Sequence, residues 1–221
     1  MLHKTRGIVF RFTKYGETSI IVNIFTELFG LQSYIVNGVR SHSKSSKIAL
    51  FQPLTLLDLV VYHKENASLT RIKEVRCLHP YQTLTTDMRK SAISMFLNEV
   101  INKSVKEQAH AQDLCLFLIT SFQQLDVMDR GFENFHLVFL IRLSQFLGFR
   151  PGNTHEIIGT GILSTSEEQA LGQLLSMNYS VALSLNLSER RNLLELILRF
   201  YASHVELGDL RSLAVVRELI Y

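Results

Sequence analysis

The spacing of apolar residues changes at Pro80, and this change constrains the fold more than any other feature of the chain. Before Pro80, apolar and polar residues alternate with a period near two, which is typical of β-strands. After Pro80, apolar residues recur every three or four positions, as they do on one side of an α-helix. The sequence therefore predicts an α+β, multidomain chain with one domain in residues 1–80 and a second in residues 81–221.

Five short runs before Pro80 have the composition of strands, and turn signals such as Tyr15-Gly16 and Asn37-Gly38 separate them. The runs cover residues 8–12, 19–25, 31–36, 54–62 and 69–78. Five strands of this length suit a small closed barrel of the OB type, because closure leaves no strand edge exposed. The first domain is therefore predicted to be a five-stranded OB-type β-barrel.

The second half of the chain has the pattern of an all-α domain. Helical spacing is clearest in residues 93–101, 114–125 and 135–146. Ser164 and Glu167 have the spacing of a capping box, which predicts the start of another helix. Ser188 is expected to cap a long helix that reaches about Val205, and a last helix is expected to end at Tyr221.

Positive charge is concentrated in the predicted barrel. Residues 1–80 contain 11 Lys and Arg against 5 Asp and Glu, whereas residues 81–221 contain 12 against 15. A basic barrel suits nucleic acid, since neutralisation of phosphates supplies most of the affinity that does not depend on sequence. A barrel whose charges serve only solubility has the same count, so charge alone leaves both interpretations open.

The composition favours a folded protein of the cytosol. Apolar residues make up 47% of the chain, but no apolar run approaches the 18 residues of a membrane span. The first residues lack the apolar core of a signal peptide, so we expect no export. The two cysteines, Cys77 and Cys115, form no CxxC pair and no disulfide framework, which suits a reducing compartment. Both are expected to be buried.

Motifs of catalysis are missing from the sequence. There is no GxxxxGK[ST] loop for a triphosphate, no GxSxG nucleophile and no HExxH zinc helix. We therefore expect a protein that is not an enzyme and carries no cofactor. The acidic pairs Asp126 with Asp129 and Glu167 with Glu168 leave a carboxylate metal site open. A metal-dependent nuclease consequently remains as one alternative.

Several short motifs, in a fixed order, resemble bacterial RecO recombination proteins. They are Lys4-Thr5-Arg6-Gly7-Ile8-Val9, Tyr15-Gly16-Glu17-Thr18-Ser19, Gly38-Val39-Arg40, Leu50-Phe51-Gln52-Pro53-Leu54, Leu147-Gly148-Phe149-Arg150-Pro151, and Tyr201 with His204 ahead of Leu210-Arg211-Ser212. The resemblance covers most of the chain. It implies a DNA repair protein of the bacterial cytoplasm and nucleoid, with an OB-fold DNA-binding domain and a helical domain.

The same resemblance implies function and partners. It implies binding of single- and double-stranded DNA, annealing of complementary strands, and cooperation with RecR to load RecA onto strands coated by single-strand binding protein. The alternative is an OB-fold adaptor that contacts proteins and has no primary role on DNA. Many members of the family hold a structural zinc with four cysteines after the segment that corresponds to Phe149-Arg150-Pro151. This chain has no cysteine there, and only His155 could serve as a ligand between Pro151 and Ser188, so we predict a variant without zinc.

An OB-type groove binds single strands with cations along the phosphates and aromatic rings under the bases. We expect phosphate contacts from eight cations of the first domain: Arg11, Lys14, Arg40, Lys44, Lys47, Arg71, Lys73 and Arg76. Tyr15, Tyr34 and Tyr62 are candidate stacking platforms, and the alternative is that these rings belong to the barrel core. The acidic tail of single-strand binding protein would need an apolar pocket rimmed by arginine, for which Arg130, Arg142 and Arg150 are candidates. The Ser-rich segment around Lys44 is expected to be an exposed loop.

Overall fold

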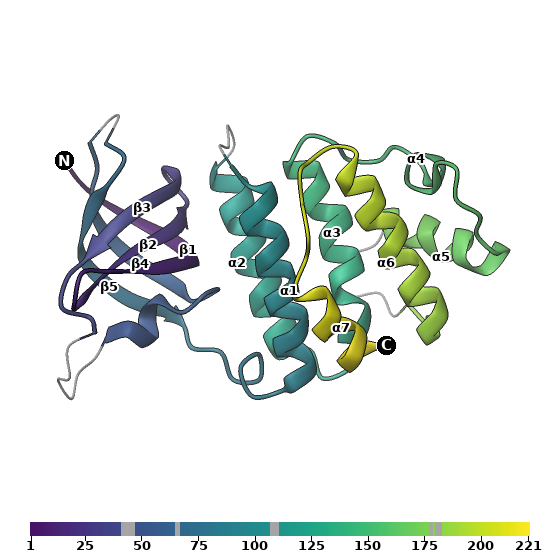
Figure 1. The fold of residues 1–221 in the computed structure, drawn as a ribbon, viewed down its shortest axis with the longest axis horizontal. Coiled ribbons are helices and arrows are strands. Elements are labelled where there is room, and N and C mark those ends of the chain that lie inside the picture. The colour runs from purple at the N-terminus through teal and green to yellow at the C-terminus, as the bar shows by residue number, and fades with distance from the viewer. Residues whose placement is uncertain (41–46, 65–66, 107–110, 177–178, 180–182) are drawn as a thin grey trace. The chain divides into compact units, whose positions relative to one another are not determined.

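A computed structural model describes residues 1–40, 47–64, 67–106, 111–176, 179 and 183–221 (Figure 1). The chain divides into two compact units. One contains residues 1–81 together with 105–123, and the other contains residues 82–104 together with 124–221. The predicted domain boundary at residue 80 stays a prediction, and the two units differ from it in the placement of the segment 105–123. None of the described helices is long and apolar enough to cross a membrane.

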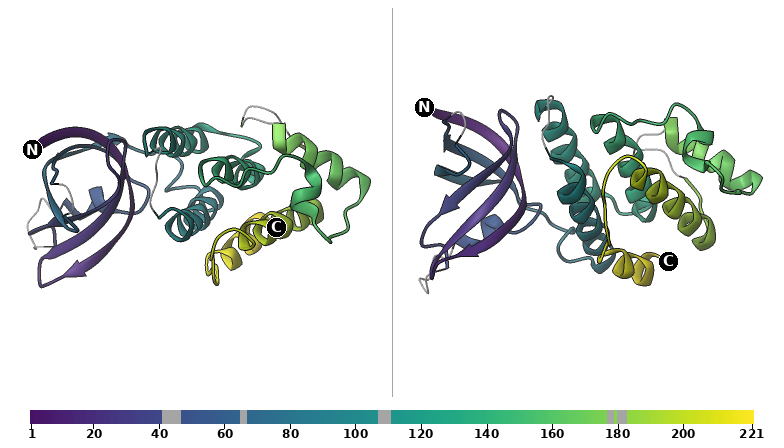
Figure 2. Two further views of the ribbon diagram at one scale, coloured as in Figure 1. Left: turned by 90° about the horizontal axis from the view of Figure 1, so that it is seen from above. Right: turned by 45° about the horizontal axis from the view of Figure 1, so that its top comes forward.

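The first unit contains a closed barrel, which Figures 1 and 2 show from three directions. Its strands are β1 (Leu2–Tyr15), β2 (Ser19–Thr26), β3 (Gly30–Val36), β4 (Leu56–Tyr62) and β5 (Thr70–His79). They close in the order β1-β2-β3-β5-β4, with β3 and β5 parallel and every other pair antiparallel. This arrangement confirms the predicted five-stranded OB-type barrel. A 3₁₀ turn, η1 (Lys47–Phe51), precedes β4.

Strand β1 is much longer than the predicted run of residues 8–12, because it serves two neighbours. Its first half pairs with β4 and its second half with β2, so the strand bends round the barrel. A β-bulge lies between Val9 and Arg11, where such a bend is expected. Gly7 lies at the start of the overlap, and a Cβ there would come within 2.8 Å of the Ile24 side chain. A larger residue at this position would push β1 away from β2.

Two layers of apolar side chains surround the strands. The barrel interior is formed by Val9, Ile20, Val22, Ile24, Tyr34, Val39, Phe51, Leu57, Leu59 and Val61, all of which are buried. On the outer side, Phe10 and Phe25 are also buried, and their rings stack with centroids 5.5 Å apart. The Cys115 thiol donates to the Phe25 carbonyl at 3.8 Å, so helix α2 (Ala111–Val127) lies against this surface with residues of the same unit.

The second unit is helical, as predicted. It contains α1 (Met88–Ser104), η2 (Phe132–Asn134), α3 (Phe135–Phe146), α4 (Thr154–Ile158), α5 (Thr165–Ser176), α6 (Leu187–Ala202) and α7 (Leu213–Ile220). Helix α3 lies between α1 and α6, and α7 packs against α1 (Figures 1 and 2). The short helix α4 was not predicted. It begins after Asn153, whose side chain accepts a hydrogen bond from the Glu156 backbone.

One of the two predicted helix caps is confirmed and one is wrong. The Ser164 backbone donates to the Glu167 carboxylate, and the Glu167 backbone donates to Ser164 Oγ, as in a capping box. Helix α6, however, is capped by Asn186 and not by Ser188. Asn186 Oδ1 accepts from the Glu189 backbone at 3.0 Å while the Glu189 carboxylate accepts from the Asn186 backbone at 3.0 Å, so both residues satisfy free N–H groups.

A polar network lies inside the helical unit. Arg190 is buried and donates to Asn134 Oδ1 and to the backbone carbonyls of Leu185 and Ile220. His136 is fully buried, and its Nε2 lies 2.6 Å from the hydroxyl oxygen of Tyr221. Buried polar groups are tolerated when they are hydrogen-bonded in this way. His136 Nδ1 is an exception, since it has no hydrogen-bond partner within the described part of the chain.

Candidate nucleic-acid interface on the barrel

A row of outward-facing residues crosses four strands of the barrel. Thr13 of β1 pairs with Ile21 of β2, and Ile21 pairs with Ile35 of β3. Ile35 in turn pairs with Arg71 of β5. These residues alternate with buried neighbours such as Tyr34, so their side chains leave the barrel on its outer surface. The register therefore places an arginine at the end of a row that contains two half-buried isoleucines.

A second row runs beside the first. Arg11 of β1 pairs with Asn23 of β2, which pairs with Ser33 of β3. We refer to the two rows together as the β2–β3 face, which consists of Arg11, Thr13, Ile21, Asn23, Ser33, Ile35 and Arg71. The two arginines lie at its opposite margins, on β1 and β5.

The charge on the β2–β3 face is entirely positive. None of its seven residues is acidic, and both arginines are exposed. Neither Arg11 nor Arg71 forms an ion pair or side-chain hydrogen bond with any residue that the structure describes. Lys73, two residues after Arg71 on β5, is also exposed and without such a partner in the described ranges. Cations in this state can bind phosphate without first giving up a carboxylate.

A mixed charge pattern occurs where β4 pairs with β1 on one side and with β5 on the other. Lys4, Arg6, Asp58, Glu74 and Arg76 make up what we call the β4 face, and all of them except Arg6 line a hollow of about 240 Å³. The Lys4 ammonium lies 4.0 Å from the Asp58 carboxylate, and Asp58 pairs in register with Arg76. Two of the five residues of this face are carboxylates, so Arg76 has a different environment from Arg71.

Arg6 on the β4 face is held by Glu27 of the β2–β3 turn. Its Nε and Nη2 donate to the two oxygens of the Glu27 carboxylate at 2.9 and 2.7 Å. This hydrogen bond raises the pKa of Arg6 against the opposing effect of burial, and the same contact lowers the pKa of Glu27. A bidentate pair of this kind is already satisfied and offers little to a phosphate.

Three of the remaining predicted cations are described by the structure, and they lie at the end of β1, after β3 and in η1. Arg40 is half-buried, and its Nη1 donates to the backbone carbonyls of Gly16 and Ser19 at 3.2 and 3.3 Å. It therefore ties the chain after β3 to the β1–β2 hairpin. Lys14 is exposed near the end of β1, and Lys47 is exposed at the start of η1. Lys44 lies outside the described residues. The assignment of all eight cations to DNA stays a prediction.

The three candidate tyrosines differ in exposure. Tyr34 is 1% exposed and belongs to the barrel core, where burial raises the pKa of its hydroxyl. It cannot serve as a stacking platform. Tyr15 and Tyr62 are 52% and 48% exposed, so both rings can be reached.

The two cysteines also differ in exposure. Cys115 is buried as expected, whereas Cys77 is exposed on β5, where it pairs with the interior Leu57 of β4.

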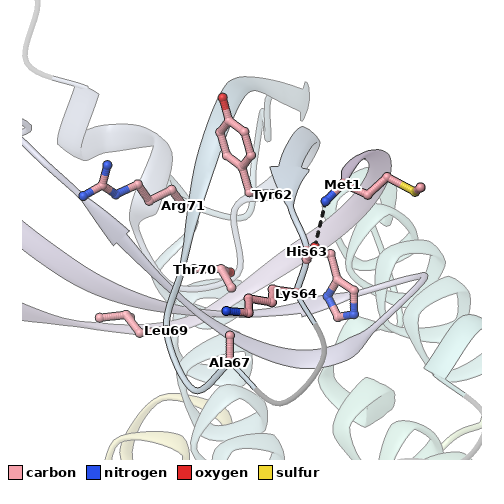
Figure 3. A pocket seen from close by; sticks show the side chains of 8 residues that line it. All are labelled: Met1, Tyr62, His63, Lys64, Ala67, Leu69, Thr70 and Arg71. Carbon is pink, nitrogen blue, oxygen red and sulfur yellow. Dashed lines mark hydrogen bonds between the residues drawn. The ribbon is translucent and has the colours of Figure 1, made fainter.

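A hollow at the β4–β5 connection was missed from the sequence. It has a volume of about 470 Å³ and is lined by Met1, Tyr62, His63, Lys64, Ala67, Leu69, Thr70 and Arg71 (Figure 3). Glu65 and Asn66 of the same connection lie outside the described residues. OB folds use this connection, together with the outer side of β2 and β3, to bind oligonucleotides. Tyr62 and Arg71 were both singled out from the sequence, but nothing in the sequence indicated that they line one hollow.

The three arginines proposed for a protein partner are not gathered in one place. Arg130 precedes η2, Arg142 lies within α3, and Arg150 follows α3. Helix α3 has 12 residues and is therefore about 18 Å long, which separates Arg130 from Arg150. Arg142 lies with its guanidinium 5.3 Å from the centre of the Tyr179 ring. A pocket rimmed by these arginines stays a prediction.

The acidic residues singled out earlier have structural partners. Asp126 is buried, and its carboxylate accepts hydrogen bonds from the backbones of Gln82, Thr83 and Leu84 at 2.8 to 3.1 Å. Glu167 accepts from Ser164 and from the side-chain amide of Asn192. Among the described residues no group of three or more His, Cys, Asp and Glu side chains could hold a metal ion. The prediction of a protein without zinc is not tested by this geometry.

A closed OB-type barrel with an unpaired basic outer face defines a class of protein, the oligonucleotide-binding modules. Comparison with known proteins identifies the particular family. Residues 1–81 match the family described as recombination protein O N terminal, and residues 85–161 match recombination protein O C terminal. The chain belongs to the RecO family.

Relatives of similar length support this assignment. A protein of Bacteroides fragilis named DNA repair protein RecO is 37% identical over 99% of both chains. Proteins with the same name from Phocaeicola vulgatus and Flavobacterium johnsoniae are each 35% identical, over 99% and 98% of both chains. Membership of this family supports a role in DNA repair and recombination.

Proposed function

We propose that this protein binds single- and double-stranded DNA through the β2–β3 face and anneals complementary strands. In this proposal it also cooperates with RecR to load RecA onto single strands coated by single-strand binding protein, and it works on the nucleoid in a bacterial cytoplasm. The observation that carries the proposal is the unpaired, carboxylate-free β2–β3 face between Arg11 and Arg71.

The physical basis of binding is phosphate neutralisation along this face. Exposed arginines release counterions when they contact phosphates, and this favours binding to any sequence. The half-buried Ile21 and Ile35 between the arginines offer apolar surface to bases without selecting among them. Asn23 and Ser33 complete a neutral surface that does not repel a polyanion. The face therefore suits binding that is strong at low salt and tolerant of sequence.

Annealing follows from binding two strands at once or in quick succession. Two single strands repel each other through their phosphates, and cations that neutralise some of these charges lower the repulsion. The sequence contains no loop for binding nucleoside triphosphates, so the work must come from binding energy. We therefore expect annealing without ATP.

The experiment that tests this function measures pairing of two labelled complementary oligonucleotides with and without the protein, in the absence of ATP. Faster pairing with the protein supports the proposal. No acceleration at low salt, or acceleration only after addition of ATP, contradicts it. Cleavage of the labelled DNA in the presence of magnesium or manganese would favour the metal-dependent nuclease instead.

A matched pair of double variants locates the function on the barrel. Arg11→Ala with Arg71→Ala removes two cations from the β2–β3 face, whereas Lys4→Ala with Arg76→Ala removes the same charge from the β4 face. The first variant should slow annealing and flatten the salt slope of single-strand binding by about 1.4, from roughly 0.7 per lost contact. The second should change both quantities little. Equal effects of the two variants would mean that only total charge matters.

The adaptor function has one observation in its favour, which is the β4 face. Lys4 and Arg6 already lie beside carboxylates, and the neighbouring Leu28 and Leu78 are 53% and 36% exposed. Such a mixed surface is more typical of a protein contact than of a DNA contact. We propose it as a docking surface for protein partners, in addition to the DNA face. If the protein bound no DNA at low salt, the adaptor would become the better description.

A further inference from the structure

The hollow at the β4–β5 connection combines an exposed aromatic ring with a cation. Val61 of β4 pairs with Ile72 of β5, so the next residue on each strand, Tyr62 and Arg71, are cross-strand neighbours. Val61 and Ile72 pack in the barrel core, and their neighbours therefore leave the barrel on the outer surface. Figure 3 shows both side chains at the ends of their strands, with Leu69, Thr70 and Ala67 on the returning segment.

The hollow continues the β2–β3 face. Arg71 belongs to both surfaces, because it pairs with Ile35 of β3 and also lines the hollow. A strand of DNA that follows the row from Thr13 through Ile21 and Ile35 reaches Arg71 and then Tyr62. The aromatic ring thus lies at the end of the proposed phosphate path.

The lining has the chemistry of a base pocket. Tyr62 presents a ring that is 48% exposed, and Ala67 and Leu69 add apolar surface. Lys64 and Arg71 supply positive charge, and none of the eight described lining residues is acidic. The volume of about 470 Å³ lies in the range of roughly 300 to 1,000 Å³ that is usual for pockets of small organic ligands.

The wall beside Tyr62 is held in place by a second aromatic contact. The ring of His63 stacks on Phe29 of the β2–β3 turn, with centroids 3.8 Å apart and planes inclined by 6°. His3 of β1 contacts the same Phe29 ring edge-on at 5.2 Å. These contacts join the residue after Tyr62 to two other elements of the barrel, so the chain at the end of β4 is anchored.

We propose that this pocket binds one unstacked base of single-stranded DNA, with the base on the Tyr62 ring and the adjoining phosphate beside Arg71. The proposal rests on the DNA-binding function proposed above and adds a site for the base to it. A base in a duplex is stacked and paired, and removing it from the stack costs a few kcal/mol. The pocket therefore gives the protein a preference for single strands.

The test compares oligothymidine with an abasic oligonucleotide of the same length, which has the same phosphates but no bases. The wild-type protein should bind oligothymidine more tightly. Tyr62→Ala should weaken binding of oligothymidine by about 5- to 150-fold, as expected for the loss of one stacked base, and should leave the abasic strand unchanged. Tyr62→Phe keeps the ring and should keep the preference.

The outcomes separate this proposal from the proposed function. If the wild-type protein binds neither strand at low salt, the DNA-binding function itself is wrong, and the pocket proposal is wrong with it. If it binds both strands with a steep salt dependence but Tyr62→Ala lowers neither affinity, only the pocket proposal is wrong. A Tyr62→Phe protein that behaves like Tyr62→Ala would point to the hydroxyl instead of the ring.

Discussion

His136 should make the helical unit sensitive to mild acid. Its imidazole in α3 is fully buried beside Arg190. Burial is the main reason, and the Arg190 charge the second, that its pKa is lowered from 6.5 to about 3. The ring of Phe96 and the hydroxyl of Tyr221 complete its surroundings. No carboxylate of the described residues opposes this lowering.

The sign and size of the effect follow from the two pKa values. The unfolded chain protonates His136 near pH 6.5, whereas the folded chain does so only near pH 3. Between these values the unfolded state binds the extra proton, so the free energy of unfolding falls as the pH falls. The loss is about 1.4 kcal/mol for each pH unit below 6.5, which amounts to about 2 kcal/mol between pH 7 and pH 5.

The assay compares two substitutions that each remove one imidazole. His136→Gln cannot titrate, so its free energy of unfolding should fall by about 2 kcal/mol less than that of the wild type between pH 7 and pH 5. His155→Gln removes an exposed histidine from α4 and should leave the wild-type pH dependence intact. Urea unfolding followed by the helical circular dichroism signal measures all three proteins. If His136→Gln loses as much stability on acidification as the wild type, the buried neutral imidazole is not the cause.

Three further predictions concern bound zinc, Arg40 in the turn after β3, and Glu99, which accepts hydrogen bonds from the residues just before α7. The purified protein should contain no stoichiometric zinc and keep its melting temperature in chelator, and one tightly bound equivalent in elemental analysis would contradict this. Arg40→Ala should cost about 1 kcal/mol of stability in urea unfolding, because it loses two hydrogen bonds to backbone carbonyls, whereas Lys47→Ala on the exposed surface should cost almost nothing. Burial alone would raise the pKa of Glu99, but hydrogen bonds from Ser212, Arg211 and Lys103 outweigh it and lower the pKa to about 2. The stability that the ionised carboxylate contributes is therefore complete above pH 4.5 and is lost as the pH falls toward 2. Glu99→Gln should therefore lower the unfolding free energy at pH 7 by roughly 2 to 3 kcal/mol, and an unchanged value would refute the role of that carboxylate.

Much of the fold could be predicted from local pattern, and the errors have physical causes. Alternation located all five strands, but it could not predict that β1 extends from Leu2 to Tyr15, because that length depends on pairing with two distant strands. The helix predicted around residues 114–125 was found. Most of it belongs to the barrel unit, because the apolar rings of Phe10 and Phe25 on the outside of the barrel are buried, and this could not be predicted from the helix sequence. Ser188 and Asn186 are both good capping residues, and only the position of Glu189 three residues after Asn186 decides between them.

The candidate site was less predictable, because the eight cations were chosen by type and segment alone. Arg71 and Arg76 lie five residues apart on one strand, yet Arg71 pairs with Ile35 and Arg76 pairs with Asp58. A register shift within β5 lies between them, and no sequence pattern announces it. Arg40 could not be recognised as a structural residue, since its partners are backbone carbonyls.

The central claim is that the barrel binds DNA by neutralising phosphates, and the affinity for single-stranded DNA at several salt concentrations tests it most directly. If Arg11, Arg71 and Lys73 all contact phosphates, the logarithm of the association constant should fall linearly with the logarithm of the salt concentration. The slope should be about −2 or steeper, from roughly 0.7 per contact. An affinity that does not change with salt, or no binding at all in low salt, would contradict the account.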